Sequence, residues 1–325
     1  MKTNLTSHTD KNNFNNIIKP AIKNVFDEKI TWIQRFKTWL CHYVYDILLN
    51  SWKKAVFRIS SAENKNLIEW SVYWYKYLNE LWIEIPKILF SDTTCEKYEL
   101  PFTISERLDW DDIWNVVDRL SDENLNEIAK KIANIQNKIS TLKPWKGFWE
   151  ATSYEDNSLE NTWLEYIYEK IGRAEKNIIK FNIFDVSYVN KVKELIENNI
   201  NYLENVEPKP FFDDITSKNI IINNWKFNWV VDFDSITFWD KLFWLWLTNM
   251  AFISLDNDIY IKYLIKHLNC TKDDEKIINI YTLIFCINFM SEIGEKFNKD
   301  EAVIDENKVE RYKEIYEELY CKIKK

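Results

Sequence analysis

The stretch FFDDITSKNIIINNWKFNWVVDFDSITFWD, which spans residues 211–240, decides the fold that we predict for this chain. Its apolar run Ile220–Ile222 is separated by the polar break 223–226 from a second apolar run that ends at residues 230–231. Two short apolar runs around a polar break predict a β-hairpin. We therefore expect the residues before its first strand and after its second strand to lie at one edge.

Three polar side chains flank this predicted hairpin. Asp214 and Asn219 precede the first strand, and Asp232 follows the second strand. In phosphoryl transfer, one carboxylate can orient the acceptor hydroxyl and take its proton, while an amide oxygen and a second carboxylate hold Mg²⁺ on the nucleotide phosphates. The pattern therefore favours phosphoryl transfer, and a surface hairpin with solvated acids is the plain alternative.

The same residues resemble a known family. The spacing Asp214-x4-Asn219, the apolar hairpin and the sequence VDFD at residues 231–234 resemble the catalytic core of aminoglycoside phosphotransferases and choline-kinase-like enzymes. The resemblance implies the protein-kinase-like fold, with ATP as the phosphoryl donor and Mg²⁺ as the metal. It also implies that Asp214 is the catalytic base, that Asn219 and Asp232 are metal ligands, and that Asp240 braces the catalytic loop.

The chain departs from the family pattern at two places. The family usually has His-Gly before the catalytic aspartate, whereas this chain has Phe212-Asp213. Asp213 is a rival for the role of base, but the spacing to Asn219 favours Asp214. The missing histidine, together with Arg58 in place of a kinase lysine, motivates a second hypothesis, a catalytically silent kinase-like module that binds nucleotide.

Arg58 and Glu69 are the residues that we expect to steady the nucleotide phosphates. Arg58 lies in a strand-like run where kinases keep a lysine, and its planar guanidinium can contact phosphate, although it is not equivalent to lysine. A solvated cation on an edge strand is the alternative. Residues 63–81 are predicted to form a helix on which Glu69 is the candidate partner of Arg58, with Glu63 and Glu80 as competitors.

The segment 98–108 is predicted to be the strand that leads into a hinge between two lobes. Family members bind adenine at this hinge through backbone groups, which makes Glu106 a candidate for nucleotide binding. We predict an α+β, bilobal protein-kinase-like fold. Its parts are a polar N-terminal segment 1–28, a small β-rich N-lobe 29–104 with one main helix, and a larger, mostly α-helical C-lobe 105–325.

Periodic apolar residues predict the helices of the C-lobe. Ser121 is a good N-cap for the first long helix, and residues 109–118 before it are predicted to be a loop. The further predicted helices span residues 161–179, 186–203, 242–255, 258–268, 273–296 and 308–323. Family members bind the acceptor among such helices, but most charged residues on helices are simply solvated, and we assign no acceptor residue.

Glycine is scarce and tryptophan abundant, with 3 Gly and 16 Trp among 325 residues. Average glycine usage is about 7%, and turns need glycine because it adopts positive φ at little cost. Several tryptophans stand where glycine is expected. Trp225 lies in the predicted hairpin turn, Trp52 lies in a second turn, Trp82 follows a predicted helix, and Trp39 lies in the predicted loop over the phosphates.

We hypothesise that most of these tryptophans are glycines in the living cell. Some bacterial lineages read the UGA codon as glycine, whereas a common alternative genetic code reads it as tryptophan, so translation with the wrong code would produce this sequence. Trp163 lies in a helical pattern and is interpreted as a genuine tryptophan, and Trp74 is left undecided. An aromatic-rich protein with genuine tryptophans is the alternative.

Charge and cysteine content limit the classes of partner. The formal net charge is −8, which disfavours a nucleic-acid partner and is compatible with a cationic small-molecule acceptor. Five dispersed cysteines and a polar N-terminus predict a cytoplasmic protein. The most apolar stretch, residues 242–255, is too short for a membrane span. The sequence indicates neither the identity of the acceptor nor the oligomeric state.

Overall fold

The computed structural model describes residues 14–36, 42–61, 65–108, 111–145, 147–156, 162–234, 236–255, 257–295 and 304–324. The chain divides into two compact units: unit 1 comprises Met1–Asp111, Thr152–Glu155 and Asn228–Ser235, and unit 2 comprises Asp112–Ala151, Asp156–Phe227 and Ile236–Lys325. Within the ranges above, no helix is long and apolar enough to cross a membrane.

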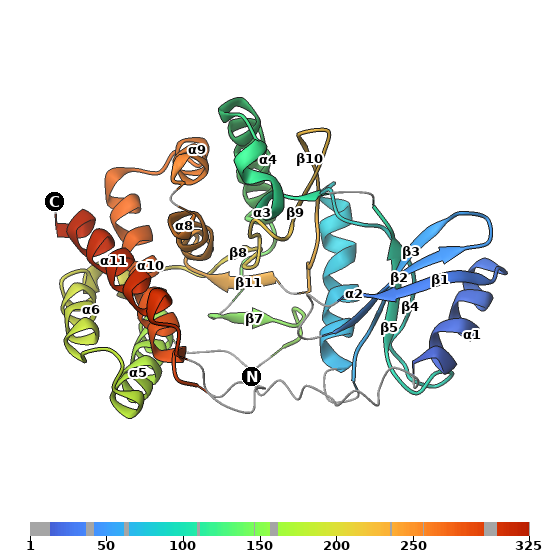
Figure 1. Cartoon of the computed structure of the whole chain (residues 1–325), viewed down its shortest axis with the longest axis horizontal. Coiled ribbons are helices and arrows are strands. Elements are labelled where there is room, and N and C mark those ends of the chain that lie inside the picture. Colours follow the sequence, from blue (N-terminus) through green and yellow to red (C-terminus); the bar gives the residue numbers. More distant parts are fainter. Residues whose placement is uncertain are drawn as a thin grey trace. The chain divides into compact units, whose positions relative to one another are not determined.

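Unit 1 contains a five-stranded antiparallel sheet with the strand order β1-β2-β3-β5-β4 (Figure 1). Its strands are β1 (Ile30–Arg35), β2 (Tyr43–Leu49), β3 (Lys54–Ile59), β4 (Ile88–Asp92) and β5 (Phe102–Glu106). Successive side chains of a strand point to opposite faces of a sheet. In β3 the buried Ala55, Phe57 and Ile59 therefore point to one face, and Arg58 points to the other.

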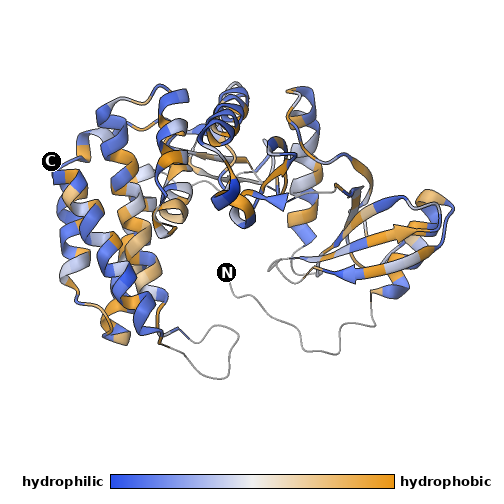
Figure 2. Ribbon diagram, turned by 45° about the horizontal axis from the view of Figure 1, so that its top comes forward, coloured by the Kyte–Doolittle hydropathy of each residue, from blue (hydrophilic) through white to orange (hydrophobic). Residues whose placement is uncertain are grey.

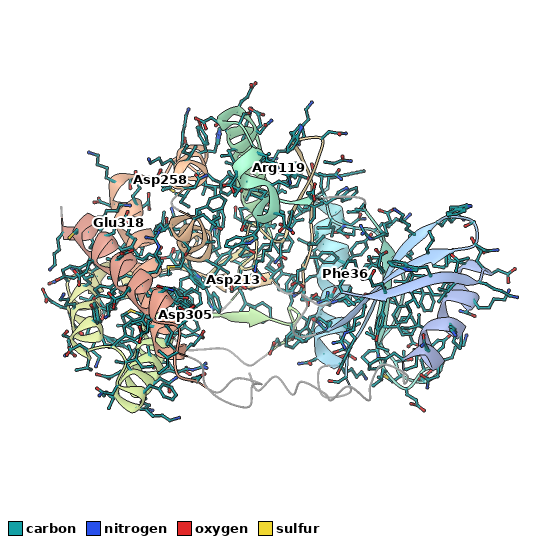
Figure 3. All side chains as sticks on the ribbon, in the orientation of Figure 1. Phe36, Arg119, Asp213, Asp258, Asp305 and Glu318 are labelled. Carbon is teal, nitrogen blue, oxygen red and sulfur yellow. The ribbon has the colours of Figure 1, made fainter. Side chains whose placement is uncertain are left out.

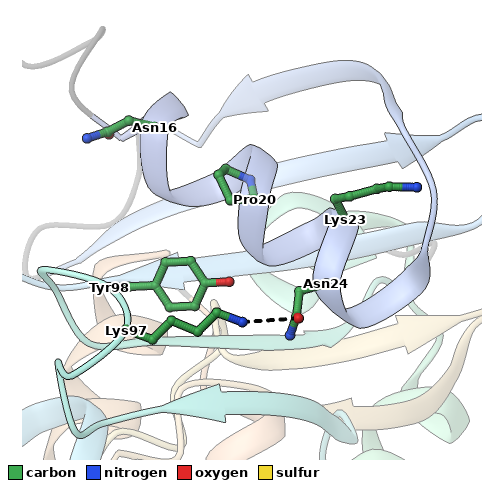
Figure 4. A pocket seen from close by; sticks show the side chains of 6 residues that line it. All are labelled: Asn16, Pro20, Lys23, Asn24, Lys97 and Tyr98. Atoms are coloured by element: carbon green, nitrogen blue, oxygen red, sulfur yellow. Dashed lines mark hydrogen bonds between the residues drawn. The ribbon is translucent and has the colours of Figure 1, made fainter.

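Helix α1 (Asn15–Phe26) packs on the face of this sheet that carries Phe57, and its Ile18 and Ile22 belong to the same hydrophobic core. Figure 4 shows an open depression beside α1, where Lys97 Nζ donates to Asn24 Oδ1 at 3.1 Å. The depression is lined by Asn16, Pro20, Lys23, Asn24, Lys97 and Tyr98. None of the predicted site residues lines it.

Helix α2 (Lys65–Glu80) confirms the predicted helix of unit 1. It ends in a Schellman motif, in which the Ile83 N–H donates to the Leu78 oxygen at 3.0 Å and the Trp82 N–H donates to the Asn79 oxygen at 3.0 Å. Trp82 occupies the left-handed position of this motif, with φ 53°. That position is the one where glycine is usual, as the sequence predicts.

Trp52 occupies a second left-handed position, with φ 67°, in the predicted turn between β2 and β3. The Trp52 N–H donates to the Leu49 oxygen at 3.0 Å, and the Leu49 N–H donates to the Lys53 oxygen at 2.9 Å. A three-residue hairpin loop of this kind usually has glycine at its left-handed residue. The Trp52 side chain is 81% exposed, so no packing favours tryptophan there.

The predicted hairpin at the centre of the quoted stretch is confirmed as β9 (Ile220–Asn223) and β10 (Lys226–Val230). Its two-residue loop has positive φ at both residues, 49° at Asn224 and 64° at Trp225. This is the combination that a type I′ turn requires, and Asn-Gly is its preferred sequence. The backbone therefore meets the expectation at three predicted glycine positions, while the reassignment of the codon stays a prediction.

Two further tryptophans use their side chains. Trp163 is 1% exposed and donates from Nε1 to the Tyr281 hydroxyl at 2.8 Å, as expected for a genuine tryptophan. Trp74 is fully buried on α2 and makes edge contacts with Tyr73 at 5.1 Å and Tyr154 at 5.2 Å between ring centroids. Trp39 lies outside the described residues.

Unit 2 is mostly α-helical, which together with the sheet of unit 1 confirms the predicted α+β class. Its helices are α3 (Ile113–Val116), α4 (Asp122–Ile139), α5 (Trp163–Phe181), α6 (Ser187–Glu197), α7 (Ile200–Glu204), α8 (Leu245–Ser254), α9 (Ile259–His267), α10 (Lys272–Glu292) and α11 (Glu306–Lys324). Helix α10 packs against α5, α6, α8 and α11, so it forms the centre of this unit. Figure 2 shows hydrophobic and hydrophilic residues on different sides of several of these helices, as amphipathic packing requires.

The region before α4 is wrongly predicted as a loop at residues 109–118. It contains α3 and a 3₁₀ helix at Val117–Arg119. The Asp112 side chain accepts from the Asn115 N–H at 2.9 Å, so an aspartate N-cap begins α3. The predicted Ser121 cap of α4 is confirmed by a capping box.

The helix predicted at residues 186–203 is interrupted. Helix α6 ends at Glu197 and α7 begins at Ile200. Asn199 donates from Nδ2 to the backbone oxygen of Leu195 at 2.7 Å, and such side-chain bonds compete with the helical backbone pattern. Apolar periodicity continues through this break and therefore does not reveal it.

Two small sheets anchor the predicted catalytic loop. In one, β11 (Ile236–Trp239) lies between β7 (Trp149–Ala151) and β8 (Lys209–Phe211), and the other has the strand order β10-β9-β6, with β6 at Asp111–Asp112. Strand β8 leads into residues 212–219, and β9 follows them. The loop is therefore held at both ends by paired strands.

Candidate active site

Residues 212–219 form the loop that the sequence predicts to be catalytic. Asn219 donates from Nδ2 to the backbone oxygen of Asp214 at 2.9 Å, so the predicted base and one predicted metal ligand are held in the same loop. Asn219 is 9% exposed, and its Oδ1 has no partner among the residues that the structure describes. That oxygen can therefore accept a cation or a hydrogen-bond donor.

Asp213 and Asp214 differ in exposure. The Asp213 side chain, marked in Figure 3, has one buried carboxylate oxygen, whereas the Asp214 side chain is exposed. A base must reach the proton that it accepts, so accessibility favours Asp214 over its neighbour. This agrees with the preference that the spacing to Asn219 gives.

The backbone just before these aspartates is bound by Gln136 of α4. Gln136 donates from Nε2 to the Phe212 oxygen at 2.8 Å, and the Phe212 N–H donates to Gln136 Oε1 at 3.0 Å. Both residues are buried, at 4% and 3% exposure. Sequence reasoning missed Gln136, although an amide on the apolar face of a predicted helix was the signal that could have revealed it.

The expected role of Asp240 as a brace of the loop stays a prediction, and its printed hydrogen bonds go to residues outside the loop. Asp240 is 1% exposed and accepts from the Leu242 N–H at 2.8 Å and the Tyr281 hydroxyl at 2.6 Å. Strands β11 and β8 are antiparallel, and Trp239 pairs with Lys209 at the end of β8 that is opposite the loop. Asp240 therefore leaves the sheet away from the loop, and burial raises its pKa while its hydrogen bonds oppose that rise.

In unit 1, Arg58 is bound by two carboxylates that follow β10. Its guanidinium donates to both carboxylate oxygens of Asp234, and its Nη2 also donates to Asp232 Oδ1 at 3.3 Å. The Arg58 side chain is 12% exposed, so this is a largely buried ion pair. The structure thus brings two predicted site residues, Arg58 and Asp232, together, and adds Asp234, to which the sequence assigned no role.

His42 completes this cluster. Its Nε2 lies 3.1 Å from Asp234 Oδ2, and the histidine is 4% exposed. Burial and the nearby Arg58 charge lower the pKa of His42. Burial opposes ionisation of Asp234, but Arg58 and His42 outweigh it and lower the pKa of this carboxyl to about 2. Asp234 is therefore a carboxylate at neutral pH.

Asp232 itself has a left-handed backbone, with φ 63°. Aspartate visits this conformation more readily than most residues, although at some cost. Two residues earlier, the Val230 N–H donates to the Glu84 oxygen at 2.8 Å, so this hydrogen bond fixes the chain just upstream of Asp232. The carboxylate of Asp232 then accepts from Arg58.

Glu69 is not the partner of Arg58, which corrects the prediction. Its ion pair in the structure is with Lys65 at 3.3 Å on the surface of α2. The buried stripe of α2 passes through Ile68 and Trp74, and the neighbouring position 69 points away from it because successive helix residues are rotated by about 100°. The competitor Glu63 lies outside the described residues.

Glu106 ends β5, and its carboxylate accepts weakly from the Lys87 N–H at 3.4 Å. Its own N–H donates to the Lys87 oxygen at 3.0 Å. The side chain therefore stabilises the end of the β4–β5 region, while its predicted role at the nucleotide stays a prediction. The loop over the phosphates was predicted at residues 38–45. Residues 38–41 lie outside the described residues, and residues 43–45 belong to strand β2.

The metal prediction depends on oxygen donors. Across the described ranges, no group of three or more His, Cys, Asp or Glu side chains is placed to hold a metal ion. The oxygens of the Asn219 amide and of the Asp232 carboxyl group are nevertheless hard donors, the kind that Mg²⁺ prefers and supplements with water and phosphate oxygens. Each of these two donors, taken by itself, therefore fits Mg²⁺ by its chemistry.

Comparison with known proteins adds a family and a fold. Residues 42–243, more than half of the chain, match the model of the APH family, described as the phosphotransferase enzyme family. No curated protein sequence matches the chain. The matched range includes Arg58, the loop 212–219 and the predicted hairpin β9–β10.

Several solved structures are similar over nearly the whole chain. A GDP complex of an aminoglycoside 2′-phosphotransferase-IIIa variant has a TM-score of 0.68 at 13% identity, covering 95% of this chain and 98% of that chain. ADP-bound aminoglycoside phosphotransferase APH(2″)-Ib has a TM-score of 0.65 at 12% identity, with coverages of 96% and 99%. The GDP and kanamycin complex of APH(2″)-IIIa has a TM-score of 0.66 at 13% identity, with coverages of 95% and 99%. This likeness confirms the predicted protein-kinase-like fold.

Proposed function

This chain belongs to the phosphotransferase enzyme family, and from that premise we propose that it transfers the γ-phosphoryl group of ATP to a hydroxyl group of a small acceptor. The acceptor contains an amine or a sugar. The single observation that carries the proposal is the loop in which Asn219 holds the backbone of the exposed Asp214. A loop of this kind presents a base and a metal ligand on one short, fixed segment.

Asp214 is the residue that we assign to the acceptor. Its carboxylate orients the acceptor hydroxyl and accepts its proton as the hydroxyl oxygen bonds to the γ-phosphorus. The bond between the γ-phosphorus and the bridging oxygen then breaks, and ADP leaves with the electron pair. Positioning of the two reactants supplies most of the acceleration in this chemistry.

Arg58, Asn219 and Asp232 are the residues that we assign to the nucleotide. The side-chain oxygens of Asn219 and Asp232 would hold Mg²⁺, which neutralises charge on the phosphate oxygens. The Arg58 guanidinium donates hydrogen bonds to a phosphate, a role that its fork of N–H groups suits. Glu106, at the end of β5, is assigned to the nucleotide because adenine is bound near this strand in the family that the sequence resembles.

The acceptor class is supported by charge and by the similar structures. A net charge of −8 favours an approaching cation, and one similar structure contains kanamycin. Similar structures contain ADP or GDP, so the choice between ATP and GTP belongs in the test. We propose ATP as the donor and Mg²⁺ as the metal.

The experiment combines purified protein with MgATP or MgGTP and a panel that contains kanamycin, choline and sugar alcohols. Mass spectrometry of the acceptor should show one added phosphoryl group. Asp214→Asn should abolish the product, whereas the matched variant Asp213→Asn should retain it. Loss of product in Asp213→Asn alone would transfer the role of base to Asp213.

A catalytically silent module is the second candidate, and the engagement of Arg58 by Asp234 is the observation that favours it. An arginine held by two protein carboxylates is less available to phosphate. Calorimetric binding of MgATP without product from any acceptor, and without phosphate release, would select this candidate. Product from one acceptor removes it.

A further inference from the structure

Gln136 binds the backbone of the catalytic loop from the neighbouring helix, and we propose that it is a positioning residue that holds Asp214 in its reactive place. The inference rests on the proposed phosphotransferase function, because it assumes that Asp214 is the base. Gln136 touches no reactant in this proposal. It acts through the backbone of Phe212, two residues before the base.

The contact is a complete two-way amide pair. Gln136 Nε2 donates to the Phe212 oxygen at 2.8 Å, and Gln136 Oε1 accepts from the Phe212 N–H at 3.0 Å. Strand β8 ends at Phe211, so the backbone of Phe212 has left the β-ladder. At Phe212, the side chain of Gln136 from helix α4 therefore makes the two hydrogen bonds that a neighbouring strand would otherwise make.

The chemistry of the site selects glutamine. Every other buried residue of α4 is apolar, including Ile132 and Ile139, so an amide there must find its partners within the protein. Buried polar groups cost free energy unless they are hydrogen-bonded. An amide side chain of this length offers one donor and one acceptor to the backbone C=O and N–H of the same residue, whereas methionine has no donor and only a weak sulfur acceptor.

The pair acts at the entrance of the loop, on the backbone of Phe212. Further along, Asn219 Nδ2 holds the Asp214 oxygen at 2.9 Å and the Trp114 N–H holds the Ser217 oxygen at 3.2 Å. Asp214 is thus held at its own backbone oxygen by Asn219, and the chain two residues upstream is held by the Gln136–Phe212 pair. Loss of that pair removes the upstream restraint, so the segment that carries the Asp214 side chain can turn about its remaining contact with Asn219.

The expected kinetic signature follows from this arrangement. A base displaced by about 1 Å can lower the rate about 100-fold without weakening the binding of substrate. Gln136→Met, which keeps the volume and removes both hydrogen bonds, should therefore lower kcat about 10- to 100-fold with the nucleotide KM nearly unchanged. Gln136→Glu should fall between this variant and the wild type, because its carboxylate still accepts from the Phe212 N–H but meets the Phe212 oxygen with another acceptor.

The test measures two quantities on the full chain. Formation of ADP from MgATP is followed with kanamycin and with water as acceptors, and hydrogen exchange is followed in a peptide that contains the Phe212 amide. Ile132→Val is the matched control, because it removes one methylene from a buried residue of the same helix and removes no hydrogen bond to Phe212. Gln136→Met should speed exchange at Phe212 and lower kcat, and Ile132→Val should do neither.

Unchanged exchange at Phe212 in Gln136→Met overturns the inference, whatever the turnover. Faster exchange with unchanged kcat overturns it as well, because the loop would then be loosened without effect on the base. If Asp214→Asn retains turnover, the assignment of Asp214 as the base fails instead, and if no acceptor gives product, the proposed function fails; neither outcome involves Gln136. An equal loss of kcat in Ile132→Val would show that reduced helix stability alone accounts for the effect, and would also overturn the inference.

Discussion

Replacement of Trp52, Trp82 and Trp225 by glycine should stabilise the folded protein, because all three have a left-handed backbone, with φ between 53° and 67°. That conformation costs a residue with a Cβ about 1–2 kcal/mol. Glycine loses about 0.5–1 kcal/mol more conformational entropy on folding, so the net gain is about 0.5–1 kcal/mol at each position.

The three tryptophan side chains contribute little to the stability of the folded protein. Trp52 and Trp82 are 81% and 84% exposed, and Trp225 is 47% exposed. The Trp225 ring lies 5.7 Å from the Arg119 guanidinium, a contact that is worth about 0.5 kcal/mol at an exposed site. The three turns belong to different elements, so their effects should add to about 2 kcal/mol in the triple glycine variant.

The assay is urea unfolding of each variant, followed by far-ultraviolet circular dichroism and by tryptophan fluorescence. Each Trp→Gly variant is paired with Trp→Ala at the same position, because alanine removes the same indole but keeps the Cβ. Glycine should be more stable than alanine at all three positions. Equal stability of the glycine and alanine variants at two or more positions would refute the backbone argument.

Trp163→Gly is the opposite control. This side chain is buried and hydrogen-bonded to Tyr281, so its loss should destabilise the protein by about 3–5 kcal/mol.

Peptide mass spectrometry of the protein from its native cell tests the codon hypothesis itself. Glycine is expected at position 225 and also at positions 239 and 246, where buried indole N–H groups have no partner in the described part of the chain. Detection of tryptophan at positions 225 and 239 in these peptides would refute the hypothesis that the codons are read as glycine.

Three further outcomes are expected. Asp214→Asn should lower kcat by about 100- to 10,000-fold while calorimetry shows unchanged nucleotide affinity; wild-type turnover would exclude Asp214 as the base. Asp232→Ala should weaken MgATP binding, and identical Mg²⁺ titrations of mutant and wild type would contradict its assignment. The pKa of Asp234, lowered from 3.8 to about 2, predicts stability that is present above pH 4 and lost as the pH falls through 2. By this shift, Asp234→Asn should cost about 2 kcal/mol at neutral pH and progressively less in acid, measured by urea unfolding at a series of pH values.

The elements with local signals were predictable from the sequence. The hairpin β9–β10 has an apolar run on each side of a polar turn, and α2 has a periodic apolar stripe, so both were predicted correctly. Local side-chain bonds caused the errors. Asp112 begins α3 inside a segment that was predicted as a loop, and Asn199 interrupts a helix whose apolar period continues. Neither bond changes the hydrophobic pattern that carried the prediction.

The site was predictable only where its residues are close in sequence. Asp214 and Asn219 are five positions apart, and the structure joins them by a hydrogen bond. The partners of Arg58 and Phe212 come from 176 and 76 positions away, so spacing could not identify Asp234 or Gln136. Glu69 was chosen for its place on a predicted helix, but a glutamate one position off the buried stripe faces solvent.

The contact at Phe212 bears on whether the departure from His-Gly has damaged the site. A phenylalanine there loses the polar side chain of histidine, yet its own side chain is buried and its backbone is fixed on both sides by Gln136. The path of the chain into Asp214 is therefore determined by backbone bonds, which do not depend on the side chain at position 212. It follows that Phe212→His should leave kcat within about threefold of the wild type, whereas removal of the Gln136 amide should lower it about 10-fold or more. A larger change of kcat in Phe212→His than in the Gln136 variant would mean that the side chain at position 212 controls the loop. The replacement of the family histidine by Phe212 would then again favour a catalytically silent module.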